Sequence, residues 1–418
     1  MSTTNNQFFL NLTSFLIYLY PISLIFSPFL TNTIIFLIGI YGLINFKSFD
    51  FKSLIKNQFI IFFFIFWILV SLRSLFTEHI FFSLKSSFLF IKYLFFILGF
   101  LFIIKNNKNF LKNFTKVFLF VFLIVIFDAF LQFVYGSNLI GYSAAQIENQ
   151  RISGFFGDEL ILGSYIVRFS FLIIALILLT NLKIKNIYIF FFIILSFLAA
   201  LISGERTALA LSIMSIIFFI ILTNLINFKL KISLLIIISL IVTGSFKFND
   251  KIKHRMNMTV RDIASSEHIL MFSEGHGSHF KTAFNLFKDN KIFGQGANNF
   301  RKKCSNEKFF VGPYGCSTHP HNMYLQLLAE TGLLGFIFLF LIFLKIVIYS
   351  LKHFYIKYFK RKNYLSEYEI ALLTCMLINF WPILQTGNFF SSSFGNIAII
   401  PIIFLFLSDK FNKLSFKH

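Results

Sequence analysis

Apolar runs of about twenty residues, separated by short polar connections, are the feature that most constrains this fold. A helix of that length crosses the ~30 Å hydrocarbon core of a bilayer and satisfies its own backbone hydrogen bonds there. We therefore predict an all-α, polytopic membrane protein with about twelve transmembrane helices. The predicted spans are residues 8–26, 28–46, 59–76, 84–104, 117–135, 160–179, 187–202, 208–226, 232–246, 323–350, 367–386 and 394–408.

The connections between these runs alternate in charge. Every second connection carries lysines, whereas most of the others are short and contain few of them. Because lysine and arginine accumulate on the cytoplasmic side of membrane proteins, this alternation places both termini in the cytoplasm. The lysine-bearing connections are residues 47–58, 105–116, 180–186, 227–231, 351–366 and 409–418.

Composition agrees with this class of protein. Of 418 residues, 57% are hydrophobic and only 13% are charged, which is far from the balance of a soluble domain. The formal net charge of +21 would suggest a nucleic-acid partner in a soluble protein. Here the positive residues lie between apolar runs, so the positive-inside rule accounts for them and no nucleic-acid partner is expected.

The largest polar segment, residues 247–322, falls on the opposite, outer side of the membrane. It separates predicted helices 1–9, in residues 1–246, from predicted helices 10–12, in residues 323–418, within one integrated membrane domain. Inside it, residues 278–290 have apolar side chains spaced for one face of a helix. Two interpretations remain open: this helix lies along the membrane interface, or it packs against its own loop.

Arginine and histidine gather on the predicted outer side, where the topology rule does not require them. Arginine offers a planar fork of donors that suits phosphate oxygens, so a diphosphate near the membrane surface is an obvious ligand. The outer charged and imidazole set is Arg151, Glu159, Arg206, Arg255, Arg261, His276, His279, His319 and His321.

The outer segment joins the next apolar run at residues 318–335, where Pro320 fixes a turn and a helix is predicted to start near His321. A helix N-terminus offers free N–H groups and a partial positive charge, so it favours an anion and disfavours a protonated histidine. A neutral His321 could then act as a base. The alternative is a histidine that only caps the helix.

Two cysteines, Cys304 and Cys316, lie in the same outer segment and could form a disulfide that closes the loop before His319. The alternative is two free thiols. No HExxH motif or close Cys/His set accompanies His319 and His321, so no metal and no other cofactor is expected.

Two charged residues, Asp128 and Arg168, lie inside predicted spans, where charge is costly. Each is roughly 10–12 Å from the outer end of its helix at 1.5 Å per residue. A structural ion pair between them is one interpretation. The other is that Arg168 lines a cavity that receives a lipid-linked phosphate.

The outer junction also resembles a known family. His321-Asn322, nine residues and then Gly332-Leu333-Leu334-Gly335 is similar to the signature of O-antigen ligases. The run HPHNMYLQLLAETGLLG resembles the core shared by the O-antigen ligase and polymerase superfamily. Three further segments resemble elements of that superfamily in order and spacing: RISGFFGDELILGSY, SGERTALA and FNLFKDNKIFGQGANNF.

This resemblance implies a glycosyltransferase-C-like enzyme of the bacterial inner membrane, whose active site faces the periplasm. It implies an undecaprenyl-diphosphate-linked glycan as donor and lipid A–core as acceptor, among membrane lipids. The sequence departs from the ligase pattern at Asp158-Glu159-Leu160 and at Ala210, so an O-antigen polymerase remains open. Further alternatives are a protein O-oligosaccharyltransferase and a lipid-linked glycan transporter, although no internal repeat supports a transporter.

The resemblance also implies roles for single residues. Arg151 and Arg206 would stabilise the departing diphosphate, and His321 would take the proton of the acceptor hydroxyl. His319 would orient its neighbour or bind the diphosphate. Glu330 lies about two and a half turns beyond His321 and cannot touch it, so it would hold an arginine or anchor the bundle. The substrate-binding candidates are His319, Arg168, Asn322, Glu330 and Glu159.

Overall fold

The computed structural model describes residues 2–144, 151–248, 253, 274–383, 385–411 and 414–416. Apart from two isolated β-bridges, the regular elements of this part of the chain are helices, which confirms the all-α prediction. The chain forms two compact units, each assembled from three separate segments. Unit 1 comprises Met1–Ser27, Asn107–Val260 and Ile346–Asn379, and unit 2 comprises Pro28–Asn106, Arg261–Lys345 and Phe380–His418.

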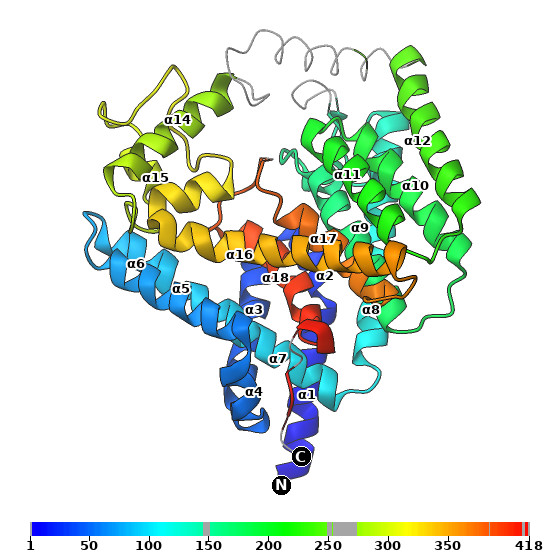
Figure 1. The fold of residues 1–418 in the computed structure, drawn as a ribbon, viewed down its shortest axis with the longest axis horizontal. Coiled ribbons are helices and arrows are strands. Elements are labelled where there is room, and N and C mark those ends of the chain that lie inside the picture. The colour runs from blue at the N-terminus through cyan, green and yellow to red at the C-terminus, as the bar shows by residue number, and fades with distance from the viewer. Residues whose placement is uncertain are drawn as a thin grey trace. The chain divides into compact units, whose positions relative to one another are not determined.

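Unit 1 is organised around α9, which is mostly apolar and is buried along most of its length. It packs against α8, α10, α11 and α17 (Figure 1). The helices of unit 1 are α1 (Ser2–Tyr18), α2 (Tyr20–Phe26), α8 (Phe110–Tyr135), α9 (Leu162–Leu179), α10 (Asn186–Ile202), α11 (Arg206–Leu222), α12 (Phe228–Phe248) and α17 (Glu367–Asn379), with the 3-10 turn η5 (Gly154–Phe156) before α9.

Unit 2 is built on a tight pair, α3 and α7, whose backbones touch through glycines. A Cβ added at Gly99 would lie 2.1 Å from the carbonyl oxygen of Ile38, so only glycine fits there. The elements of unit 2 are α3 (Pro28–Ile44), η1 (Phe46–Ser48), α4 (Phe51–Lys56), α5 (Gln58–Ser74), α6 (Ile80–Phe88), η2 (Leu89–Ile91), α7 (Lys92–Asn106), α14 (Glu274–Asp289), α15 (Phe300–Lys303), α16 (Met323–Phe359, in this unit as far as Lys345), α18 (Ser392–Leu405) and η6 (Asp409–Phe411).

Helix length supports a multi-pass membrane protein. Among the described residues, five helices are long and apolar enough to cross a membrane, and a sixth is added if α1 and α2 count as one. Shorter apolar helices occupy five of the other predicted spans: Pro28–Ile44, Gln58–Ser74, Asn186–Ile202, Arg206–Leu222 and Gly395–Leu405. The count of twelve and the outer location of residues 247–322 stay predictions.

Some predicted spans are not single straight helices. The first is bent by 42° between α1 and α2, where Pro21 lies in the first turn of α2 and cannot continue an incoming helix. The span predicted at 84–104 is divided among α6, η2 and α7. The span predicted at 367–386 ends at Asn379, because Pro382 restricts the backbone before it.

Candidate active site

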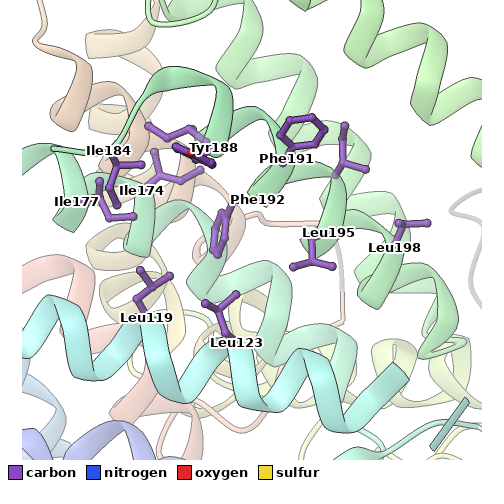
Figure 2. A pocket seen from close by; sticks show the side chains of 12 residues that line it. Leu119, Leu123, Ile174, Ile177, Ile184, Tyr188, Phe191, Phe192, Leu195 and Leu198 are labelled. Atoms are coloured by element: carbon purple, nitrogen blue, oxygen red, sulfur yellow. The ribbon is translucent and has the colours of Figure 1, made fainter. Parts of the chain in front are cut away.

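An apolar cavity of about 480 Å³ lies in unit 1 among α8, α9, α10 and the turn between the last two (Figure 2). Residues such as Leu123, Ile174 and Phe192 line it, and the hydroxyl of Tyr188 is the one polar group on a lining side chain. None of the predicted site residues is part of this lining. The cavity therefore has no side chain suited to the predicted proton transfer or anion binding. The candidate residues lie instead at the polar ends of the helices.

His321 lies at the junction of the outer segment and α16. The helix itself begins at Met323, and Asn322 is its N-cap. The Asn322 side-chain oxygen accepts hydrogen bonds from the backbone N–H groups of Tyr324 and Leu325, both at 3.0 Å. The Asn322 amide nitrogen donates to the carbonyl of Pro382 at 2.7 Å. These contacts give Asn322 a structural role, and its predicted contact with substrate stays a prediction.

The backbone of His321 is in the left-handed region, with φ of +56°. Histidine adopts this region more often than most residues, at a cost of about 1 kcal/mol or more. Thr386 holds it in place: its N–H donates to the His321 carbonyl at 2.8 Å, and its hydroxyl accepts from the N–H of Met323 at 2.8 Å. We call these two hydrogen bonds the Thr386 clamp.

Four imidazole rings gather around this point, and we call them the histidine cluster: His276, His279, His319 and His321. The ring centroid of His321 lies 4.2 Å from that of His319, 5.3 Å from that of His276 and 5.4 Å from that of His279. Sequence reasoning placed His276 and His279 in the outer set but gave them no role. Their spacing of three residues was the available signal, because it puts both on one face of a helix. In the described residues the cluster does not form a metal-holding group.

The cluster keeps its imidazoles neutral. Burial, and then the nearby imidazole of His279, lower the pKa of His321. Burial and the neighbouring rings lower the pKa of His276 to about 4 and that of His319 to about 3. Burial also lowers the pKa of His279. At neutral pH these side chains therefore have a lone pair available to accept a proton.

Helix α14 carries His276 and His279 to this position. Its Ala283 and Leu286 are buried in a core with Phe300, Phe309 and Ala329, so α14 packs on α15 and on the start of α16 (Figure 1). Of the two interpretations of residues 278–290, packing against its own loop is what these side chains show. One residue of the predicted apolar face, Phe284, is not buried in this core, and its side chain is 44% exposed.

Cys304 and Cys316 are joined as a disulfide, with their Cα atoms 4.9 Å apart. The bond fixes the segment that leads to His319. Gly315, beside Cys316, forms a backbone hydrogen bond with His279. The cross-link therefore connects the core under α14 with the histidine cluster.

We expect replacement of both cysteines by serine to destabilise unit 2. Closing a loop with a separation of 12 residues stabilises a fold by about 3 kcal/mol through the unfolded state. Thermal unfolding in detergent should show a lower midpoint for the double variant, and a reductant should lower the midpoint of the wild type but not that of the variant. An unfolding midpoint of the wild type that is the same with and without reductant would contradict the disulfide.

The Gly332-x-x-Gly335 part of the signature has a backbone function. Helix α16 is broken at Gly332, whose φ of 64° and ψ of −158° are accessible essentially to glycine alone. The span predicted as one helix at 323–350 is therefore two helical pieces that run on to Phe359. A Cβ at Gly332 would lie 2.3 Å from the Ile292 carbonyl oxygen, and one at Gly335 would lie 1.8 Å from the hydroxyl of Thr331.

The loop at residues 291–296 supplies the hydrogen bonds that the break removes. Gln295 N–H donates to the Ala329 carbonyl at 2.9 Å, and Gly296 N–H donates to the Glu330 carbonyl at 2.7 Å. In return, the N–H of Leu333 donates to the carbonyl of Lys291 at 2.9 Å. The loop thus satisfies two carbonyls at the end of the first helical piece and one N–H at the start of the second.

Glu330 is fully buried, and its carboxylate accepts hydrogen bonds mainly from backbone N–H groups. It accepts hydrogen bonds from the N–H groups of Asn298 at 2.8 Å and Phe300 at 3.0 Å, and from the Gln326 amide at 3.1 Å. These bonds anchor the start of α15 to α16. They support the anchoring interpretation rather than contact with substrate.

The arginines predicted to bind diphosphate lie in unit 1, where both border Glu205. Arg151 donates to the Leu160 carbonyl at 3.1 Å, and its guanidinium lies 3.9 Å from the Glu205 carboxylate. Arg206 is the first residue of α11 and is half-buried. Two arginine forks near one helix N-terminus form a site suited to an anion.

Glu205 was not singled out from the sequence. It is buried, and its carboxylate accepts hydrogen bonds from Gly163 N–H at 2.6 Å and from the N–H and hydroxyl of Ser164 at 3.1 and 2.8 Å. These N–H groups belong to the first turn of α9, so Glu205 caps that helix. Burial raises the pKa of Glu205, and Ser164 and Arg151 oppose the rise.

Of the two interpretations of Asp128 and Arg168, the ion pair between them is wrong. Arg168 donates to the side chain of Asn379 at 3.1 Å, whereas Asp128 accepts from the Leu139 N–H at 2.8 Å and from Asn138 at 3.3 Å. The guanidinium of Arg168 and the carboxylate of Asp128 are thus each hydrogen-bonded to other groups and not to one another. The last members of the predicted set are Glu159, which is exposed, and Arg255 and Arg261, which lie outside the described residues.

Comparison with known proteins agrees with the resemblance. Residues 190–340 match the family model described as O-Antigen ligase. This region contains Arg206, the histidine cluster, Glu330 and Gly332, whereas Arg151 precedes it. None of the curated proteins compared with the chain matches it. The match confirms the resemblance to the O-antigen ligase and polymerase superfamily, and it supports a membrane glycosyltransferase of that kind.

Proposed function

We propose that this chain, which carries the O-antigen ligase domain at residues 190–340, transfers a glycan from undecaprenyl diphosphate to lipid A–core on the periplasmic face of the bacterial inner membrane. The observation that carries the proposal is the histidine cluster, which lies within the matched region and presents a neutral imidazole at the N-terminus of α16. His321 is the general base of the reaction.

The base removes the proton of the acceptor hydroxyl as its oxygen attacks the anomeric carbon of the donor sugar. The bond between that carbon and the diphosphate oxygen breaks, and its electron pair leaves with the diphosphate. Protonation of His321 is disfavoured by burial and by its neighbours, so it returns its proton readily. His319, whose ring is 4.2 Å away, orients it.

Arg151 and Arg206 stabilise the negative charge that grows on the diphosphate. Fixed donors aimed at developing charge lower a barrier more than they strengthen substrate binding. Glu205 neutralises Arg151 in the resting enzyme and holds it near the start of α11.

Surface polysaccharide in a deletion strain tests the reaction class. Loss of a ligase leaves long polymer on the undecaprenyl carrier, whereas loss of a polymerase leaves lipid A with at most one repeat. Complementation with the wild-type chain should restore long polymer on lipid A. Unchanged polysaccharide in the deletion strain would contradict both the ligase and the polymerase assignments and favour the protein-glycosylation alternative.

Charge removal at the arginines should slow transfer strongly. We expect Arg206→Ala and Arg151→Ala each to lower kcat about 10²–10³-fold, the usual effect of losing one donor to a developing anion. Lysine at either position should restore only part of the rate, because a point charge lacks the fork. Arg361→Ala, in a loop of unit 1 far along the chain from both arginines, is the control and should leave transfer unchanged.

The dependence of the rate on pH follows from the state of His321. The base works only when neutral, and its pKa lies below the ordinary 6.5, so kcat/KM should rise with pH along a limb centred below 6.5 and then level off. The acid limb should disappear in a His321→Ala variant that retains residual activity. A limb centred above pH 6.5 would show that another group controls the rate.

A further inference from the structure

Two imidazoles of α14, those of His276 and His279, lie close to the proposed base His321. The His321 centroid lies 5.3 Å from that of His276 and 5.4 Å from that of His279, and those two are 6.2 Å apart. Because ring nitrogens lie on the rim of each ring, such spacings leave room for a direct hydrogen bond or for one bridging water. The three rings form a triangle through which a proton can pass.

The α14 histidines have nitrogens free to accept that proton. Nδ1 of His276 and Nδ1 of His279 are buried and have no hydrogen-bond partner. His279 is bonded to the backbone of Gly315, which engages its other nitrogen and leaves Nδ1 with the lone pair. Buried polar atoms without partners are rare in folded proteins, and a transient proton would satisfy both.

The reaction needs such an acceptor. Each transfer leaves on His321 the proton of the acceptor hydroxyl, and the base must lose it before the next turnover. His321 is partly buried, with His319 against one side of its ring. His276 is more exposed than His279, which is 9% exposed, so His276 offers the way to water.

We propose that His276 and His279 are a proton relay for His321, positioning residues that act through the base and do not touch the substrate. This inference rests on the proposed function. The N–H bond of the protonated His321 breaks as an N–H bond forms at Nδ1 of His276, directly or by way of Nδ1 of His279. His276 then releases a proton to water by breaking the N–H bond of its other ring nitrogen. In the described residues, His321, Arg301 and His279 act electrostatically on His319 and disfavour positive charge there, so the proton does not pass to His319.

The test uses the full-length protein in detergent with a lipid-linked donor. We expect His276→Ala and His279→Ala each to lower kcat about ten- to hundred-fold while KM is unchanged. Added imidazole should restore the rate, and more basic imidazoles should restore it better. The matched control is His79→Ala, at the start of α6, which should keep the wild-type rate and should not respond to imidazole.

Two results overturn the relay. One is a wild-type kcat and pH profile in both variants. The other is a loss of kcat, in variants with wild-type thermal stability, that no imidazole restores, since that is the behaviour of a packing role. If His279→Ala fails to fold, the more exposed His276→Ala decides alone. The proposed function fails separately, through unchanged surface polysaccharide in the deletion strain, and the base assignment fails through a His321→Ala enzyme that transfers glycan at the wild-type rate.

Discussion

Replacement of His321 by alanine is expected to abolish glycan transfer. A positioned general base contributes about 10²–10⁴-fold to a rate, so residual activity should be at or below 1% of the wild type. The variant should insert and fold normally, because the His321 side chain is not part of the Thr386 clamp, which uses backbone and hydroxyl groups. Transfer measured in isolated membranes, normalised to the amount of inserted protein, gives the answer.

The matched control is again His79→Ala, which removes an imidazole outside the cluster. Substrate binding provides a second check: the donor should still bind to the His321→Ala protein, because the arginines of unit 1 remain. A His321→Ala enzyme that transfers glycan at the wild-type rate would remove the base assignment and with it the role of the whole cluster.

Replacement of Gly332 by alanine is expected to prevent α16 from adopting its native course. The backbone conformation costs a non-glycine residue about 1–3 kcal/mol, and the overlap of the new Cβ with Ile292 carbonyl adds about as much. Together these costs are a large fraction of the roughly 5–15 kcal/mol by which a typical domain is stable, so we expect little folded protein. Yield after detergent extraction and the midpoint of thermal unfolding measure the effect.

Gly244→Ala is the control for this change. Gly244 also lies in a predicted span, but a Cβ added there meets nothing within 4 Å, and alanine favours a helix. The Gly244→Ala protein should therefore be as stable as the wild type. Equal stability of Gly332→Ala and Gly244→Ala would mean that α16 is not broken at residue 332.

Local features of the structure could be predicted from the sequence. Each apolar run contains a helix, because hydrophobic periodicity and length need no knowledge of the partner. The helix at residues 278–290 and the start of α16 after Pro320 are of this kind. The helix starts at Met323, two residues later than predicted, because Asn322 and not His321 forms the capping hydrogen bonds.

Features that depend on distant segments could not be predicted. Gly332 is compatible with a continuous helix until the loop at 291–296 is seen to replace the missing hydrogen bonds. Arg168 and Asp128 formed a plausible pair by depth alone, but Asn379 and Leu139 are their actual partners. His276 and His279 gain a role only because Ala283 and Leu286 fix α14 on α16.

The Thr386 clamp also sets an order of events during biosynthesis. α14 leaves the ribosome well before Thr386 does, so a nascent chain carries His276 and His279 long before His321 can be held in its left-handed conformation. The Thr386 hydrogen bond to His321 can therefore form only after Thr386 has been synthesised. Under the proposed function, we expect a chain that ends before Thr386 not to transfer glycan.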